Sequence, residues 1–149
     1  MKIWKMSVLG YFGGALYCGL ELLWRGWTHG SMFLVGGLCF LLLGAFPRRR
    51  KLWKNALLGA ACVSGIELVS GILLNRVWKL HVWDYSAMPL NLWGQICLPY
   101  CLLWIPVCAA GLWVYQHIAP HIPSVPKRKA AETSYPFFEP RHLQTPTQG

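Results

Sequence analysis

Residues 52–75 read LWKNALLGAACVSGIELVSGILLN, an apolar run that carries a single acid, Glu67. A helix needs roughly 20 mostly apolar residues to cross a bilayer, and this run is long enough. Three further apolar stretches accompany it, at about residues 6–24, 31–46 and 90–117. The sequence therefore predicts an all-α, polytopic membrane protein with four transmembrane helices, within one domain of residues 1–118.

The overall composition supports the membrane class. The chain is 55% hydrophobic and only 13% charged, whereas soluble domains carry about 25% charged residues. No run has a polar face wide enough for water, which excludes a soluble bundle. The stretch 31–46 is short, so we expect it to borrow residues from Trp27 onward, to tilt or to thin the membrane locally.

Basic residues predict the topology. With four spans, the N-terminus, the loop 47–54 and the tail lie on one side, and they hold eleven of the fourteen Lys and Arg residues. This asymmetry places both termini in the cytoplasm, with the chain in the cell membrane. It also explains the net charge of +9 without nucleic acid as a partner. The Pro- and Thr-rich residues 119–149 predict a disordered cytoplasmic tail, and we expect no cleaved signal peptide.

A short phrase occurs twice, as Gly19-Leu-Glu-Leu22 and as Gly65-Ile-Glu-Leu68. Residues 34–39 similarly align with residues 92–97, with the extra length in the second outer connection. We therefore interpret the chain as two parallel two-helix repeats, each beginning with a carboxylate-bearing span. Transporters with such repeats place their binding site at the repeat interface.

Acids inside apolar spans are costly unless they are paired or functional. Gly10, Gly14, Tyr17, Glu21 and Arg25 follow one another at helical spacing, so small residues lie below a carboxylate on one face. We expect Asn91 and Gln95 to share a face of the last span, and Asp84 to lie near Arg25 or Arg76. The predicted polar pocket, near the outer leaflet, comprises Glu21, Arg25, Glu67, Asp84, Gln95, Asn91, Asn75, Tyr85 and His29.

Six cysteines lie within the apolar spans, without Cys-x-x-Cys pairs or histidines at ligand spacing. We interpret them as packing residues. The sequence thus predicts neither a metal site nor a cofactor.

Three blocks carry a resemblance: residues 20–29 (LELLWRGWTH), residues 83–86 (WDYS) and residues 91–98 (NLWGQICL). They are similar to the bacterial CmpB-like family labelled ABC-transporter type IV, from about Ser7 to Tyr115. Where many relatives carry Asn-Arg-Gly and Pro-Ile-Tyr-Gly, this chain has Trp24-Arg-Gly26 and Gly36-Gly-Leu-Cys39, which indicates a divergent branch. The resemblance implies a multi-span protein with a permease role.

Three functional hypotheses follow. A transport component or permease would use the polar pocket; because the chain lacks a phosphate-binding P-loop, an ATPase would be a separate subunit. Alternatively, the carboxylates lock a structural or assembly subunit, in a homo-oligomer or with transporter subunits in the lipid bilayer. A lipid-active enzyme would use Glu21, His29, Glu67 and Asp84 as acids and bases. No nucleophile, metal or nucleotide motif supports that last hypothesis, so we predict that the chain is not an enzyme.

Overall fold

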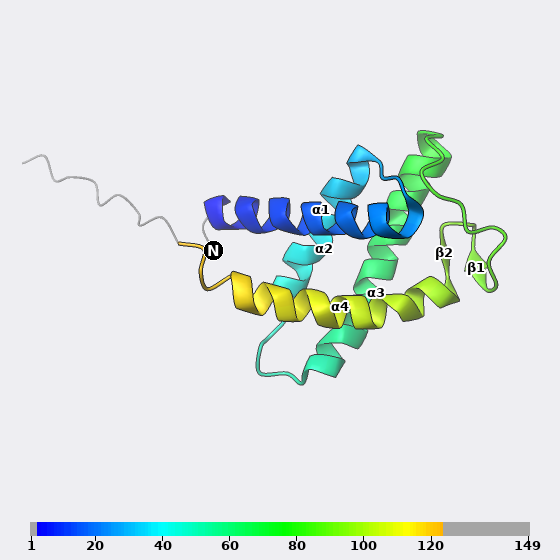
Figure 1. Ribbon diagram of the computed structural model, residues 1–149. Coiled ribbons are helices and arrows are strands. Elements are labelled where there is room, and N and C mark those ends of the chain that lie inside the picture. Colours follow the sequence, from blue (N-terminus) through cyan, green and yellow to red (C-terminus); the bar gives the residue numbers. More distant parts are fainter. Residues whose placement is uncertain (1–2, 124–149) are drawn as a thin grey trace, which may run out of the picture.

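The computed structural model describes residues 3–123. Four α-helices make up most of this part of the chain (Figure 1). Between the third and fourth helices lie a π-helical turn and a long connection that contains two very short antiparallel strands. The elements are α1 (Ile3–Arg25), α2 (Gly30–Ala45), α3 (Leu52–Gly71), the π-helical turn (Ile72–Val77), β1 (Asn91–Leu92), β2 (Ile96–Cys97) and α4 (Leu98–Ile118).

Three of these segments are long and apolar enough to cross a membrane: Ile3–Arg25, Leu52–Val77 and Leu98–Ile118. The fourth, α2, has 16 residues. At 1.5 Å per residue it spans about 24 Å, less than the hydrocarbon core of about 30 Å. Many large apolar side chains are exposed along the helices, among them Tyr11, Leu23 and Leu34. Such a surface suits lipid contact.

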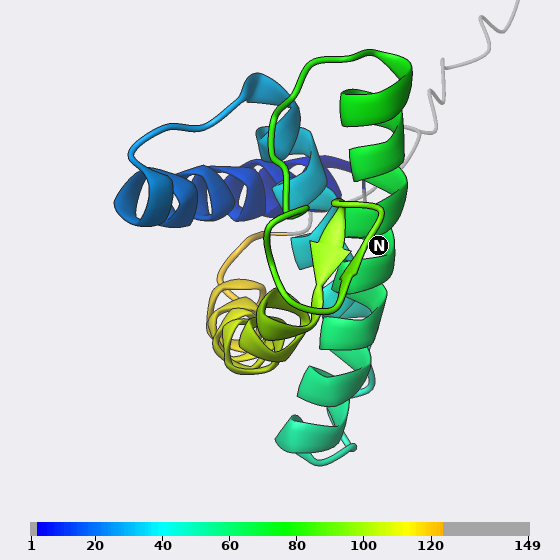
Figure 2. The same ribbon diagram turned by 90° about the vertical axis from the view of Figure 1, so that its right-hand side faces the viewer.

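The helices are arranged so that α1 and α4 run roughly parallel to each other, in opposite directions, and α2 and α3 cross them (Figure 1). In the view turned by 90°, α1 and α4 lie on one side and α3 on the other, with α2 between them (Figure 2). Packing is most extensive between α1 and α2 and between α3 and α4. A core of small and aliphatic side chains joins the last three helices: Cys39, Leu43, Ala56, Ala60, Val63, Cys108 and Leu112.

Glycines allow α1 and α2 to approach closely, as the small residues on the first span predicted. A Cβ atom added at Gly37 would lie 2.6 Å from the carbonyl oxygen of Gly10, a backbone atom. At Gly14 an added Cβ would lie even closer to the Phe33 carbonyl oxygen. These contacts between backbones are the kind that only glycine permits.

The last helix begins later than the sequence predicted. It begins at Leu98, whereas residues 90–97 form a compact hairpin. Leu90, Trp93 and Gly94 have positive φ angles, which end any regular helix there. Pro99 therefore lies in the first turn of α4, where proline is well tolerated, and only Pro106 is inside the helix.

This later start also corrects two details. Asn91 and Gln95 do not share a helix face, because both lie in the hairpin. The alignment of residues 34–39 with residues 92–97 pairs part of α2 with that hairpin, so it does not match helix with helix. The duplication itself stays a prediction.

At the opposite end of the molecule, the basic loop lies beside the end of α4. The Arg48 guanidinium donates a hydrogen bond to the Gln116 carbonyl. Beyond α4, Ala119 packs with Leu9, Phe40 and Tyr115. The predicted tail thus begins with a packed residue, and from residue 124 onward it lies outside the described part of the chain.

Candidate functional site

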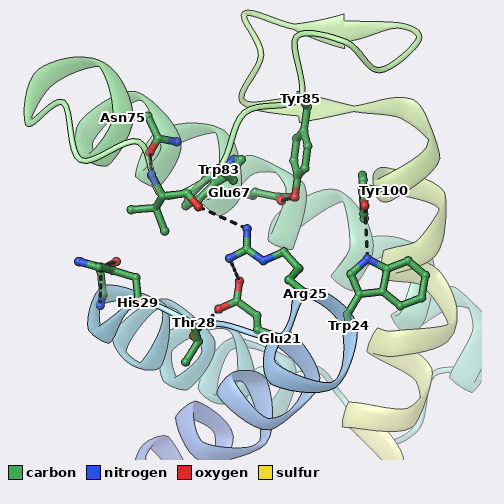
Figure 3. Close-up of polar contacts among 12 residues, drawn as sticks. Glu21, Trp24, Arg25, Thr28, His29, Glu67, Asn75, Trp83, Tyr85 and Tyr100 are labelled. Carbon is green, nitrogen blue, oxygen red and sulfur yellow. Dashed lines mark hydrogen bonds and ion pairs between the residues drawn. The ribbon is translucent and has the colours of Figure 1, made fainter.

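An ion pair on α1 forms one side of the site. Arg25 Nη2 lies 2.7 Å from Glu21 Oε1, one helical turn earlier, and Thr28 donates to the other carboxylate oxygen. The same guanidinium donates through Nη1 to the Val82 carbonyl, at 3.4 Å. Arg25 thereby connects the end of α1 to the long connection after α3 (Figure 3).

Glu67, on α3, is the buried acid of the site, with 5% of its surface exposed. Its Oε1 accepts a hydrogen bond of 3.1 Å from the Tyr85 hydroxyl, and its Oε2 accepts one of 2.8 Å from the Trp104 indole. Both donors are neutral. Among the described residues the salt bridge joins Glu21 to Arg25, and Glu67 takes no part in it. The carboxylates of Glu21 and Glu67 therefore have separate partners.

Aromatic side chains surround these acids. Tyr17 stacks on Trp104 with ring centroids 5.9 Å apart, and Tyr85 stacks on Tyr100 at 4.7 Å. The Trp24 indole donates to the Tyr100 hydroxyl at 3.4 Å (Figure 3). These five rings, together with Glu21 and Arg25, line a cavity of about 210 Å³, which we call the first cavity.

Glu67 lies directly behind the wall of the first cavity, since both of its hydrogen-bond donors line it. Burial and the neighbouring Glu67 carboxylate raise the pKa of the Tyr85 hydroxyl above its usual value. Tyr85 therefore stays a neutral donor at physiological pH. Of the predicted pocket residues, the structure brings Glu21, Arg25, Glu67 and Tyr85 together.

Asn75 and Gln95 form a second buried network, with 7% and 5% of their surfaces exposed. Asn75 Nδ2 donates to Gln95 Oε1 at 2.9 Å, and Asn75 Oδ1 accepts from the Val82 amide. The Trp83 indole donates to the Gln95 carbonyl. These bonds fix the long connection to the end of α3, so both amides position the Val82 carbonyl that Arg25 contacts.

The remaining predicted residues serve turns and a helix cap. His29 is the N-cap of α2, where its Nδ1 accepts from the Ser31 amide. Asn91 donates to the carbonyls of Ser86 and Met88. We predicted three of these side chains in the pocket, but none of them lines the first cavity: His29, Asn91 and Asp84.

Asp84 differs from the prediction most clearly. Its carboxylate accepts from the amide and the hydroxyl of Ser86, and it makes no ion pair with a described residue. The Ser86 hydroxyl, and then the Ser86 amide, lower the pKa of this exposed carboxyl. Arg76 instead donates to the Trp93 carbonyl. The expected contact of Asp84 with Arg25 or Arg76 is therefore absent.

Sequence reasoning did not include Trp24, Tyr100 and Trp104 in the pocket, because tryptophans near span ends suggest an interfacial belt. One local signal was available. Tyr100 and Trp104 are four residues apart and thus share a helix face. Within residues 3–123 there is no cluster of three His, Cys, Asp or Glu residues fit for a metal ion, and the six cysteines are free thiols.

Comparison with known proteins identifies the family. Residues 3–135 match the model of the family described as "Putative ABC-transporter type IV". The chain belongs to this family. The match confirms the resemblance carried by the WDYS block and by the block at residues 91–98. No curated protein and no solved structure matches the chain. Together with three helices of spanning length, membership of the ABC-transporter type IV family indicates a membrane-embedded transporter component.

Proposed function

We propose that the chain is the membrane-embedded component of a transport system, and that the first cavity binds the head of an organic cation. Glu67 is the observation that carries this proposal. Its two partners, Tyr85 and Trp104, are neutral, so they stabilise a carboxylate without cancelling its charge. A buried acid with an uncancelled charge marks a site for a cation or a proton.

The charges around the first cavity favour the binding of a ligand that carries one positive charge. Glu21 and Arg25 neutralise each other at 2.7 Å. Glu67, close enough to interact electrostatically with both, gives the site a net charge of −1 when its carboxyl is ionised. The five aromatic rings contribute in the same direction, since the faces of Trp and Tyr attract cations, and aromatic cages are common sites for quaternary ammonium groups.

The proposed topology places this cavity near the outer leaflet, with all four helices across the membrane and both termini in the cytoplasm. The contact between Arg48 and the end of α4 supports this topology, because it brings the basic loop next to the last span. In this arrangement the short helix α2 is accommodated by tilt or by local thinning of the bilayer. An ATPase, where one is used, is supplied by a separate subunit.

The test is cation binding to protein reconstituted in lipid nanodiscs, with tetramethylammonium as the probe. We expect Glu67→Gln to weaken binding on the order of tenfold, since it removes the negative charge behind the cavity wall. Asp84→Asn is the matched control, because it removes an exposed carboxylate away from the cavity. Thermal unfolding of each variant verifies folding. Equal binding by wild type and Glu67→Gln contradicts the proposal.

One observation favours a second candidate, an assembly subunit whose charges lock the helices. Arg25 links Glu21 on α1 to the Val82 carbonyl across the site, which is a structural role. In this case we expect a reproducible partner subunit on purification in mild detergent and no cation binding. The enzyme hypothesis stays a prediction that no contact supports, because in the described residues Glu21, His29, Glu67 and Asp84 make no hydrogen bonds with one another.

A further inference from the structure

The first cavity does not end at the aromatic rings. A second cavity of about 260 Å³ continues along α1 and α4, and four residues line both: Tyr17, Leu20, Trp104 and Val107. The two cavities therefore form one groove, which is lined by residues of α1 and α4 and, in the second cavity, also by residues of α2 and α3.

The chemistry changes along this groove. The first cavity is lined by an acid, a base and the hydroxyls of Tyr85 and Tyr100. The second cavity is lined by aliphatic and small side chains such as Leu16, Ala110 and Val114, and none of its lining residues within 3–123 is charged. A groove that carries its charged and hydroxyl groups at one end and is apolar for the rest of its length matches an amphiphile, with its head and its tail in one line.

We propose that the groove binds one single-chain amphiphile, with an ammonium head in the first cavity and its alkyl chain along the second. This inference rests on the proposed cation site and adds the class of ligand to it. The head is held by the five aromatic rings and by the net charge that Glu67 supplies. The alkyl chain of the ligand takes the place of bilayer lipid along the groove. It fills space that the protein leaves empty, which restores dispersion contacts.

The position of Val107 allows the proposal to be tested by a single substitution. Val107 lines both cavities, so it lies where the head region passes into the tail region. A larger side chain there divides the groove between its head and tail regions. Leu102, also on α4, is 56% exposed and lines neither cavity, so it offers a matched position for control.

The experiment uses the full chain in nanodiscs with hexadecyltrimethylammonium that carries a diazirine at mid-chain. After illumination, labelled residues are mapped by mass spectrometry of peptides. We expect labels on the groove residues of α1 and α4, in the region of Leu16, Ala110 and Val114. Unlabelled hexadecyltrimethylammonium should compete for this labelling, whereas hexadecyl sulfate, with the same chain and the opposite charge, should not.

Variants test the same assignment. We expect Val107→Phe to lower the competed labelling on the order of tenfold, and Leu102→Phe, which adds the same ring on the outward face, to leave it within about twofold. Tetramethylammonium, which has no chain, is measured with the same variants. Ala110→Phe, at a residue that lines the second cavity and not the first, should lower the competed labelling but bind tetramethylammonium as well as wild type does.

The outcomes separate the two proposals. Tetramethylammonium binding that depends on Glu67 supports the cation site. If, at the same time, the labels spread over the lipid-facing surfaces without competition, the proposal of a bound amphiphile is wrong and the cation site stands. If hexadecyl sulfate competes equally well, the ammonium head is wrong. If neither cation binds wild-type protein, both proposals are overturned.

Discussion

The indole nitrogen of Trp104 donates a hydrogen bond of 2.8 Å to Oε2 of Glu67, and so joins α4 to the acid buried on α3. The same indole stacks on Tyr17 of α1. Trp104 therefore connects three helices, and it forms the wall between Glu67 and the first cavity.

Trp104→Phe should destabilise the protein. Phenylalanine keeps a ring against Tyr17 but removes the donor, which leaves one oxygen of a buried carboxylate unsatisfied. Such a loss costs about 1–3 kcal/mol. Thermal unfolding in detergent measures it, with Trp113→Phe as control, because Trp113 is an exposed residue of the same helix. An unchanged melting temperature for Trp104→Phe would show that the bond contributes nothing.

The ion pair between Glu21 and Arg25 should behave as a coupled unit. Its side chains are 12% and 22% exposed, so either single change, Glu21→Gln or Arg25→Met, leaves a largely buried charge alone. We expect the double variant to be more stable than the sum of the two single effects predicts, by about 1–3 kcal/mol. A double-mutant cycle from chemical unfolding measures this coupling. Strict additivity of the two effects would mean that the pair is not coupled.

The sequence predicted the first three helices within a few residues, because their apolar runs end at charged or turn-forming residues. It misplaced the start of α4 because Leu90, Leu92 and Trp93 extend the apolar run into a hairpin. That hairpin is held by side-chain bonds of Asn91 and Gln95. Hydropathy does not distinguish an apolar hairpin from a helix, and the positive φ angles there are a property of the fold.

The contacts of the candidate site also differ in whether the sequence predicts them. Glu21 and Arg25 are four residues apart, so helix geometry alone predicts their contact. Trp104 lies 37 residues from Glu67, and Tyr85 lies 18 residues away in an irregular connection. The packing of α4 against α3 brings Trp104 to the carboxylate, and the course of the connection after α3 brings Tyr85 to it. A single sequence carries no local signal for either contact.

Two glycines should respond to alanine in opposite ways. A Cβ at Gly37 would meet the Gly10 carbonyl oxygen at 2.6 Å, so Gly37→Ala must push α1 and α2 apart. We expect a loss of about 1–3 kcal/mol. Gly65 lies on α3 with nothing within 4 Å of an added Cβ, so Gly65→Ala should stabilise by up to about 1 kcal/mol through helix propensity. Thermal unfolding compares the two, and equal shifts would refute the close approach of α1 and α2.

Asp84 should titrate below its ordinary range. The Ser86 hydroxyl and amide stabilise the charged carboxylate and lower its pKa. Because the folded pKa lies below the unfolded value of about 3.9, the stabilisation of this turn is complete above that pH and disappears as pH falls through the folded pKa. Ser86→Ala should raise the Asp84 pKa towards the unfolded value, since it removes the hydroxyl but keeps the amide.

The Asp84 pKa of wild type and of Ser86→Ala is measured from the carboxyl carbon chemical shifts of labelled protein. The titration runs from about pH 2 to about pH 6, the range in which carboxyl groups usually titrate. Ser70→Ala is the control, because the Ser70 hydroxyl bonds to helix carbonyls of α3 instead. An Asp84 titration that does not respond to Ser86→Ala would mean that the hydroxyl does not hold the carboxylate in solution.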